Sequence, residues 1–371
     1  MRGHEQSLAT VLHPGAMLSE KLQELGMPVK EFALRCGKPE ATIHEVLRGR
    51  SAVTPEMAVL FERTLGIPAH LWLSMQSRYD EESARKKLSR ELAKSQLWVT
   101  HFPYDEMVAN GYLSPLSNAS DTEKLGQLLE FFGFARISGW QKYYQMQTLG
   151  AEFHLSLSGQ SDAYALSAWL RYGERRAQRQ ADLPSYSQTR LRGQLAAMLA
   201  LANVGESHFL PRLEGLCRDA GVLLVCTPPL EGTGVLGATR WLQETPLLQV
   251  TGGTMPYDAF WFSFFHEIGH ILLHGKREVF LEGVEYSQKN LAKEEEADRF
   301  AQRCLFPRRF QKHFRDFRFT EEAMQTLCRQ LAIHPALLAK HLQHLHLLMP
   351  QDGERYSMTA ILESSSAECQ L

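Results

Sequence analysis

The sequence predicts an α+β fold that is mainly α-helical: an all-α N-terminal domain, a helical middle region and a C-terminal domain that contains a small β-sheet. Three observations lead to this prediction. Apolar residues recur at helical spacing through most of the chain, a strand-like pattern begins only near residue 221, and 371 residues are too many for one typical domain.

The composition is that of an ordinary globular protein. Apolar residues make up 44% and charged residues 22% of the chain, so it can bury a sizeable core. The formal net charge is −2, and any contact with nucleic acid must therefore come from a local surface. The six cysteines are scattered without a Cys-x-x-Cys pair, which is typical of reduced thiols. Because no apolar run suits a membrane span and the N-terminus lacks a signal-peptide layout, we expect a cytoplasmic protein with no membrane partner.

The N-terminal domain, expected at residues 1–80, is predicted to contain a set of short helices. Apolar spacing and the stop signals of glycine and proline place four of them at residues 14–26, 29–36, 40–47 and 55–65. Only Gly37-Lys38-Pro39 separates the second helix from the third, and this is the layout of a helix-turn-helix.

The middle region, expected at residues 81–210, begins with a highly charged segment of mixed sign. Residues 81–94 contain few large apolar side chains, which favours an exposed connecting helix. The remainder is mostly helical in pattern and carries many aromatic residues, which we expect to pack in a core.

The C-terminal domain is expected at residues 211–350 and the flexible tail at 351–371. Two strand-like runs open the domain, at residues 221–226 and 246–250. Three helices are predicted to follow, at residues 259–274, 294–305 and 320–348.

The first of these helices carries a metal-binding pattern. His266 and His270 are four residues apart, so both imidazoles leave one face of the helix and can bind one ion. Glu267 lies beside the first histidine, where its carboxylate can reach a water on that ion without being a ligand. Gly269 costs helix stability, which indicates that another element packs closely there. We expect one Zn²⁺ per chain.

A catalytic zinc needs a third protein ligand, and a cluster of acids 24 residues after His270 offers one. Glu294 and Asp298 share a helix face, so Glu294 can bind the metal while Asp298 accepts a hydrogen bond from a ligand histidine. The adjacent Glu295 and Glu296 leave the ligand uncertain by a residue or two. Alternatively, the glutamates only stabilise the positive end of a helix.

Other residues near the pattern could stabilise an oxyanion. His274 is four residues beyond His270 on the same face, and Tyr257 lies just upstream of the helix. The alternative for His274 is a packed histidine or one that supports a ligand. The histidines near the C-terminus lack acidic or cysteine partners at ligand spacing, so we expect them to be solvated or packed: His341, His344 and His346.

The sequence segments around the metal-binding pattern resemble the ImmA/IrrE metallopeptidase family. They are the run from Trp261 to His274, the acidic helix from Glu294 with Leu305-Phe306-Pro307 after it, and Ile333-His334-Pro335 with the helix that follows; Gly237 to Leu242 fits the longer members. The resemblance covers about residues 130–348. It implies a zincin-like peptidase domain in which Glu267 takes a proton from the zinc-bound water and passes it to the leaving amine.

The segment from His13 to Asp80 resembles the HigA-type antitoxin branch of the helix-turn-helix (XRE-type) family. Ala33, Gly37 and Ile43 occupy its small, turn and apolar positions. The resemblance implies contacts with operator DNA, to base edges or to phosphates, from Lys38, Glu40, Thr42, His44, Arg48 and Arg50. Residues 1–80 hold nine basic and nine acidic residues, so a protein-interaction domain is the alternative, and a homodimer would have to add DNA contacts.

Together these resemblances imply a DNA-binding transcriptional regulator with zinc-dependent endopeptidase activity. Its substrate would be a helix-turn-helix repressor or antitoxin, cleaved to relieve repression in a stress or phage response. The alternative is a HigA-like repressor or antitoxin that cleaves nothing and whose peptidase-fold domain senses a ligand or partner. A third possibility is self-cleavage within residues 81–100, which would detach the DNA-binding domain.

Overall fold

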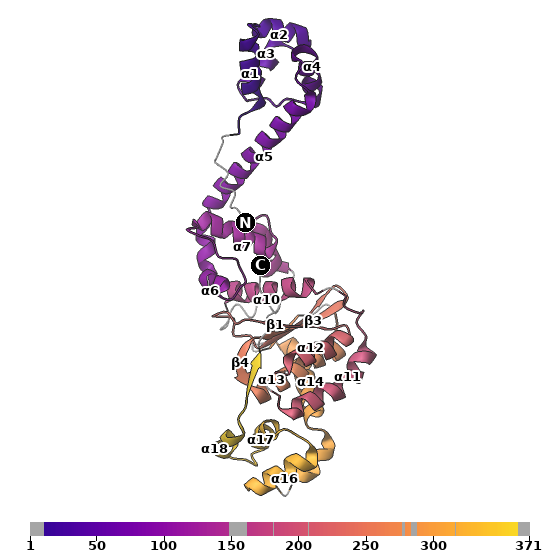
Figure 1. The fold of residues 1–371 in the computed structure, drawn as a ribbon. Coiled ribbons are helices and arrows are strands. Elements are labelled where there is room, and N and C mark those ends of the chain that lie inside the picture. The colour runs from indigo at the N-terminus through magenta and orange to yellow at the C-terminus, as the bar shows by residue number, and fades with distance from the viewer. Residues whose placement is uncertain are drawn as a thin grey trace. The chain divides into compact units, whose positions relative to one another are not determined.

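The computed structural model describes residues 11–147, 162–180, 182–206, 208–276, 279–282, 288–315 and 317–362. The chain divides into two compact units, Met1–Gln96 and Leu97–Leu371, and each is described by itself (Figure 1). Helices dominate both units, and the second also contains two small sheets, which confirms the predicted fold class.

The first unit is a cluster of five helices. They are α1 (Pro14–Glu24), α2 (Val29–Cys36), α3 (Glu40–Leu47), α4 (Pro55–Leu65) and α5 (Ala69–Ala93). Four of them were predicted at these positions. Their apolar faces meet in one core in which Leu18, Phe32, Ile43, Phe61 and Trp72 are fully buried.

Gly15 allows close packing in this unit, and Gly37 allows a tight turn. A Cβ on Gly15 would lie 2.0 Å from the carbonyl oxygen of Val46, so α1 approaches the backbone of α3 as only glycine permits. Gly37 ends α2 with φ +62°, a left-handed conformation that turns the chain tightly into α3.

Helix α5 is fixed to the core by its first half only. Its buried Gln76 accepts a hydrogen bond from the Val53 N–H at 2.9 Å and donates one to Asp80 at 2.9 Å. The domain boundary expected at residue 80 therefore falls inside this helix. The charged helix predicted from residue 81 forms its exposed second half, where Glu81 pairs with Arg85 at 2.8 Å.

The second unit opens with helices that pack through aromatic rings. In chain order they are η1 (Gln96–His101), α6 (Tyr104–Ala109), α7 (Asp121–Phe132), α8 (Ile137–Gln141), η2 (Lys142–Gln147), α10 (Ala163–Gln178), α11 (Gln188–Val204) and α12 (Leu210–Asp219). The ring of Trp140 lies 5.2 Å from that of Trp98 and is stacked 5.1 Å from Tyr164. The aromatic residues of the predicted middle region thus form a core.

A four-stranded mixed sheet follows, in the order β1-β3-β2-β5. Its strands are β1 (Leu223–Thr227), β2 (Gly237–Leu242), β3 (Thr245–Thr251) and β5 (Phe280–Glu282), with β1 parallel to β3 and the other pairs antiparallel. The strand-like runs in the sequence predicted β1 and β3 but not β2 or β5.

Helices cover both faces of this sheet (Figure 1). Arg240 on β2 donates to the Leu170 carbonyl oxygen of α10, while the next residue toward the N-terminus, Thr239, donates to the Glu267 carbonyl oxygen of α13 at 3.4 Å. Neighbouring residues of a strand point to opposite faces, so α10 and α13 lie on opposite sides.

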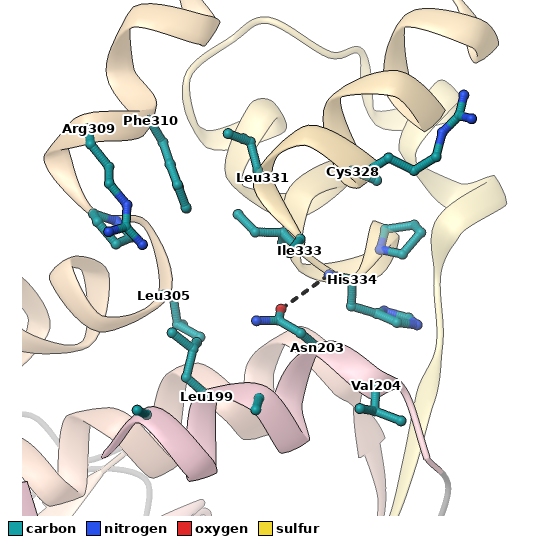
Figure 2. Close-up of a pocket in the computed structure, with 16 residues that line it drawn as sticks. Leu199, Asn203, Val204, Leu305, Arg309, Phe310, Cys328, Leu331, Ile333 and His334 are labelled. Carbon is teal, nitrogen blue, oxygen red and sulfur yellow. Dashed lines mark hydrogen bonds between the residues drawn. The ribbon is translucent and has the colours of Figure 1, made fainter. Parts of the chain in front are cut away.

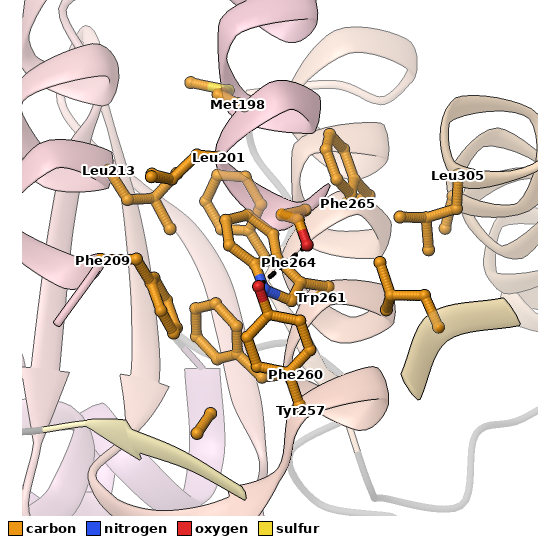
Figure 3. Packing of buried hydrophobic residues seen from close by; sticks show 14 of the residues in the cluster. Met198, Leu201, Phe209, Leu213, Tyr257, Phe260, Trp261, Phe264, Phe265 and Leu305 are labelled. Carbon is orange, nitrogen blue, oxygen red and sulfur yellow. Dashed lines mark hydrogen bonds between the residues drawn. The ribbon is translucent and has the colours of Figure 1, made fainter. Parts of the chain in front are cut away.

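Helix α13 (Tyr257–Leu273) runs through the main core of the unit. Figure 3 shows its aromatic residues Phe260, Trp261 and Phe264 packed with Phe209. A helix that is apolar on nearly every side is stable only when other elements surround it, and α13 is buried along almost its whole length. It is therefore a rigid support for the side chains that it carries.

The prediction of a flexible tail is wrong for residues 351–362. Those residues form α18 (Pro350–Gly353), η4 (Glu354–Tyr356) and β6 (Thr359–Leu362), and β6 pairs antiparallel with β4 (Gly253–Pro256). Ala360 and Leu362 are buried in the main core. Burial alternates along β6, as in a strand with one buried face.

The remaining helices are α14 (Gln288–Leu305), η3 (Arg308–Phe310), α15 (Gln311–Phe314), α16 (Glu321–Leu331) and α17 (Pro335–His344). The single helix predicted at 320–348 is wrong, because the chain breaks at residues 332–334. Ala332 has φ +53°, and His334 caps α17 by accepting the Ala336 N–H at 3.2 Å. No helix in the described part of the chain is long and apolar enough to cross a membrane.

Candidate functional site

The candidate site lies where α13 meets α14. Gly269 faces the closest approach of the two helices: a Cβ there would be 3.2 Å from the Cα of Ala297 and 3.2 Å from the Phe300 ring. The close packing predicted at Gly269 is thus present, and it sets the histidines of α13 opposite the acids of α14.

Three side chains converge at this junction. His266 Nε2 is 3.0 Å from Glu294 Oε2 and 2.9 Å from His270 Nε2, and His270 Nε2 is 3.4 Å from Glu294 Oε1. Each of the three residues offers one ligand atom, and these three atoms lie within 4.8 Å of one another. Two imidazoles and one carboxylate are a donor set that suits Zn²⁺, and three protein ligands leave a position open.

The neighbouring acids of α14 have separate partners. Asp298 Oδ1 is 2.8 Å from Nδ1 of His266, whose Nε2 faces the cluster. Glu296 Oε2 is 3.3 Å from Nε2 of His274. Glu295 is exposed and lies 3.8 Å from Arg299. Of the three adjacent glutamates, Glu294 alone is in the metal-ligand group.

His270 is held from two sides. Its Nδ1 is 2.8 Å from Nδ1 of His274, and its ring is stacked on Phe280 of β5 at 3.8 Å between centroids. With a metal on Nε2 of His270, Nδ1 would carry the proton and donate it to His274, and His274 would donate from Nε2 to Glu296. These contacts orient His270, as Asp298 orients His266.

The charge states of the cluster also suit a metal ion. Burial lowers the pKa of His270 to about 4, so its imidazole is neutral at pH 7. Burial alone would raise the pKa of Glu294, but hydrogen bonds from His266 and His270 outweigh it and lower this pKa to about 2. A neutral imidazole and an ionised carboxylate are the forms that bind metal.

Glu267, the predicted proton carrier, is fully buried beside His266. The turn of α13 that carries Glu267 is fixed to the sheet, because the backbone carbonyl oxygen of Glu267 accepts a hydrogen bond from the Thr239 hydroxyl of β2 at 3.4 Å. A carboxylate held in a buried position next to a metal-ligand group has the location that a general base requires.

Tyr257, one of the two residues considered as oxyanion stabilisers, does not join this group. Its hydroxyl is buried and donates to the Ala202 carbonyl oxygen at 2.8 Å. His266 lies nine positions after it along α13, a rise of roughly 13 Å. His341 lies outside the group as well: it is packed as predicted, stacked 3.8 Å from the Phe306 ring.

In the first unit, the predicted DNA-contacting residues lie on α3 or beside it. Lys38 Nζ is 2.7 Å from Glu56 Oε1, and His44 Nε2 is 3.5 Å from Glu40 Oε1. Thr42 is half-buried on the same helix. Lys38, just before α3, is therefore paired with an acid of its own unit.

Arg48 and Arg50 follow α3 and share one acid. Their guanidinium nitrogens lie 3.5 Å and 2.9 Å from Oε1 of Glu45. Both arginine side chains are more than half exposed, and such exposed pairs contribute at most about 1 kcal/mol. A phosphate can therefore replace Glu45 at little cost.

Two contributors to the site went unrecognised in the sequence. Phe280, which stacks on His270, lies beyond the metal helix on a short strand without a distinguishing pattern. Glu296 was present in the acidic cluster, but only the packing of α14 on α13 pairs it with His274. The i, i+4 spacing of His270 and His274 was the one local signal for this chain of contacts.

Comparison with known proteins identifies a domain in each unit. Residues 18–72 match the helix-turn-helix family, and residues 223–332 match the family of IrrE N-terminal-like domains. The chain is 33% identical over 73 residues to the uncharacterized HTH-type transcriptional regulator YddM of Escherichia coli. The matched segment makes up 20% of this chain and 78% of the relative. The chain is also 34% identical over 71 residues to virulence-associated protein A of Dichelobacter nodosus, 18% of this chain and 68% of the relative.

Two solved structures are also similar over a short part of the chain. One is a putative antidote protein of a plasmid maintenance system from Nostoc punctiforme, with 28% identity, a TM-score of 0.22, and coverage of 23% of this chain and 92% of the other. The second is an addiction module antidote protein of a HigA family from Coxiella burnetii, with 28% identity, a TM-score of 0.21, and coverage of 22% and 91%.

Proposed function

Because the chain belongs to the helix-turn-helix family through residues 18–72 and carries an IrrE N-terminal-like domain at residues 223–332, we propose that it is a DNA-binding regulator with a zinc-dependent endopeptidase centre. The observation that supports the peptidase most strongly is the convergence of His266, His270 and Glu294 beside the buried Glu267. In this proposal these three residues hold one Zn²⁺. When bound, the ion would act as a Lewis acid.

The chain's own residues then have defined tasks. Asp298 and His274 fix the ring orientations of His266 and His270, so both Nε2 atoms face one point. Glu267 accepts a proton from the attacking water and returns it to the leaving amine of the peptide bond. Its complete burial limits exchange of that proton with solvent.

The attached DNA-binding unit favours a regulatory substrate over general proteolysis. We propose that the protein cleaves a helix-turn-helix repressor or antitoxin and thereby relieves repression in a stress or phage response. The similarity to an HTH-type transcriptional regulator supports a role at an operator. Two copies of the first unit, brought together in a homodimer, would double its otherwise weak set of phosphate contacts.

The test combines metal content with cleavage. The purified wild-type protein should contain about one zinc per chain and cleave the repressor encoded beside it, whereas Glu267→Gln should retain zinc and lose most cleavage. Glu295→Gln is the matched control, since Glu295 is an exposed glutamate outside the metal-ligand group. It should cleave as the wild type does.

Two results would contradict the proposal. If the wild type binds zinc but cleaves neither that repressor nor itself under inducing conditions, the peptidase is a sensor or partner-binding module. If Glu267→Gln cleaves normally, the proton carrier has been assigned to the wrong residue.

A further inference from the structure

A pocket in the second unit lies apart from the metal cluster, between α11 and the turn that joins α16 to α17. It has a volume of about 640 Å³, within the range of small-molecule sites. Figure 2 shows Leu199 of α11 and Leu305 of α14 on one side and Leu331 and Ile333 on another, with Phe310 above them. Most of its wall is therefore apolar.

One amide projects into this apolar space. Asn203 uses its Oδ1 to accept a hydrogen bond from the backbone N–H of His334 at 3.2 Å. That bond fixes the amide, and Figure 2 shows its nitrogen turned the other way, toward Leu305 and Leu199. Its N–H groups are donors held in place for a ligand.

The charged residues of the pocket are all basic. Two arginines, Arg309 and Arg329, are among its 16 lining residues, and no aspartate or glutamate is. Arg309 lies over the Phe310 ring at 5.3 Å, and within the described residues no carboxylate forms an ion pair with it. An uncompensated guanidinium at the edge of an apolar pocket favours an anionic group there.

The imidazole of His334 adds no acceptor. Its Nδ1 is occupied by the N–H of Ala336 at 3.2 Å, so in the neutral ring the proton is on Nε2. The side chains that offer polar groups to the pocket (Asn203, Arg309, Arg329 and His334) therefore provide donors or positive charge. A ligand matched to them carries acceptors at one end and an apolar body.

We propose that this pocket binds a small apolar monocarboxylate of medium chain length, with its carboxylate at Arg309 and Asn203 and its chain against the leucines. This ligand site is additional to the proposed peptidase function and does not depend on it. Arginine and amide N–H groups are geometrically suited to the two carboxylate oxygens, and the volume excludes a folded partner.

The pocket adjoins the start of the metal-binding helix. His334 of its wall packs 5.1 Å from the ring of Tyr257, the first residue of α13, and Tyr257 donates to Ala202, the neighbour of Asn203. A ligand that holds Asn203 and the α16–α17 turn together therefore stabilises the junction of α11, α13 and α17. Binding is expected to raise the unfolding temperature of the second unit.

The experiment measures binding of decanoate to the full chain by calorimetry, with decanol as the uncharged comparison. Decanoate should bind more tightly than decanol, and Arg309→Gln should weaken decanoate about tenfold without changing decanol. Arg308→Gln is the matched control, because Arg308 is exposed, adjacent and outside the pocket lining. It should leave both affinities unchanged.

A second pair of variants tests the location. Ala200 and Ala197 are both exposed on α11, but only Ala200 lines the pocket. Ala200→Trp should abolish binding and Ala197→Trp should preserve it, each at an unchanged circular dichroism spectrum. The proposal is overturned if decanoate does not bind, if decanol binds equally well, if Arg308→Gln weakens decanoate as much as Arg309→Gln, or if Ala200→Trp binds normally.

Discussion

His270 uses both of its ring nitrogens and one ring face. Nε2 lies in the cluster with His266 and Glu294, Nδ1 contacts His274, and the ring rests on Phe280. A side chain constrained in this way would lose little conformational freedom on binding a metal ion, so we expect the affinity for the ion to depend on the groups that hold His270.

We predict that His274→Ala lowers zinc affinity by about 10- to 100-fold, because His270 then loses the acceptor that fixes its proton on Nδ1. Glu296→Gln should cause a smaller loss in the same direction. A competition titration with a chromophoric chelator measures both. His274→Asn, which offers an acceptor of similar reach, should restore part of the affinity. If His274→Ala matches the wild type, the chain of hydrogen bonds does not support the ligand.

At the scale of elements, the site is a contact between two helices. α13 supplies the histidines and α14 the acids, and Gly269 permits them to approach closely. The helices are long and buried where they touch, so the ligand geometry depends on their separation more than on any one side-chain rotamer.

Gly269→Val is expected to separate these helices and destabilise the protein by about 1–3 kcal/mol, with weaker zinc binding, because the added methyls meet the backbone of Ala297. Urea unfolding of the metal-free protein checks the stability. Gly193→Ala on α11 is the matched helical control: nothing lies within 4 Å of its new Cβ, so it should stabilise by about 0.5–1 kcal/mol. Equal stability of Gly269→Val and wild type would contradict the packing argument.

The other element with a functional prediction is α3. Replacing both Arg48 and Arg50 by Ala should weaken operator binding and reduce the slope of log affinity against log salt by about 2, since each arginine contacts a phosphate in the proposed complex. Glu45→Gln should have the opposite effect on affinity, because it frees both arginines. Binding isotherms at several salt concentrations measure this, with Arg90→Ala as an exposed control. An unchanged slope in the double variant would favour a protein-interaction role.

At the scale of the whole molecule, buried neutral histidines make stability depend on pH. Burial lowers the pKa of both His270 and His341 from 6.5 to about 4. Below pH 6.5 the unfolded chain binds protons that the folded protein does not, so the free energy of unfolding falls until about pH 4. Glu294 extends the loss below pH 4.5, because its pKa in the folded protein is about 2.

For the metal-free protein we therefore expect the free energy of unfolding, measured by urea titration, to decline steadily from pH 6.5 to pH 4, with His270 contributing at most about 1.4 kcal/mol per pH unit. His341→Phe keeps the ring that stacks on Phe306 but cannot titrate, so its decline should be shallower. An identical decline in wild type and His341→Phe would show that His341 does not contribute.

Much of this protein could be predicted because the relevant signals are local. The helix-turn-helix follows from short apolar periods and one glycine, and the pair His266 and His270 follows from a four-residue spacing that any helix converts into a shared face. Residues that are close in the chain share a helix face in this way whatever the rest of the fold is.

The tertiary structure decided what depends on contacts between distant segments. The packing of α14 on α13 selects Glu294 from three adjacent glutamates and assigns Glu296 to His274, while Tyr257 is turned away to Ala202. Pairing of β6 with β4 converts a predicted tail into core. The physical reason is that a one-residue shift along a helix rotates a side chain by about 100°, and only the neighbouring helix determines which rotation faces the histidines of α13.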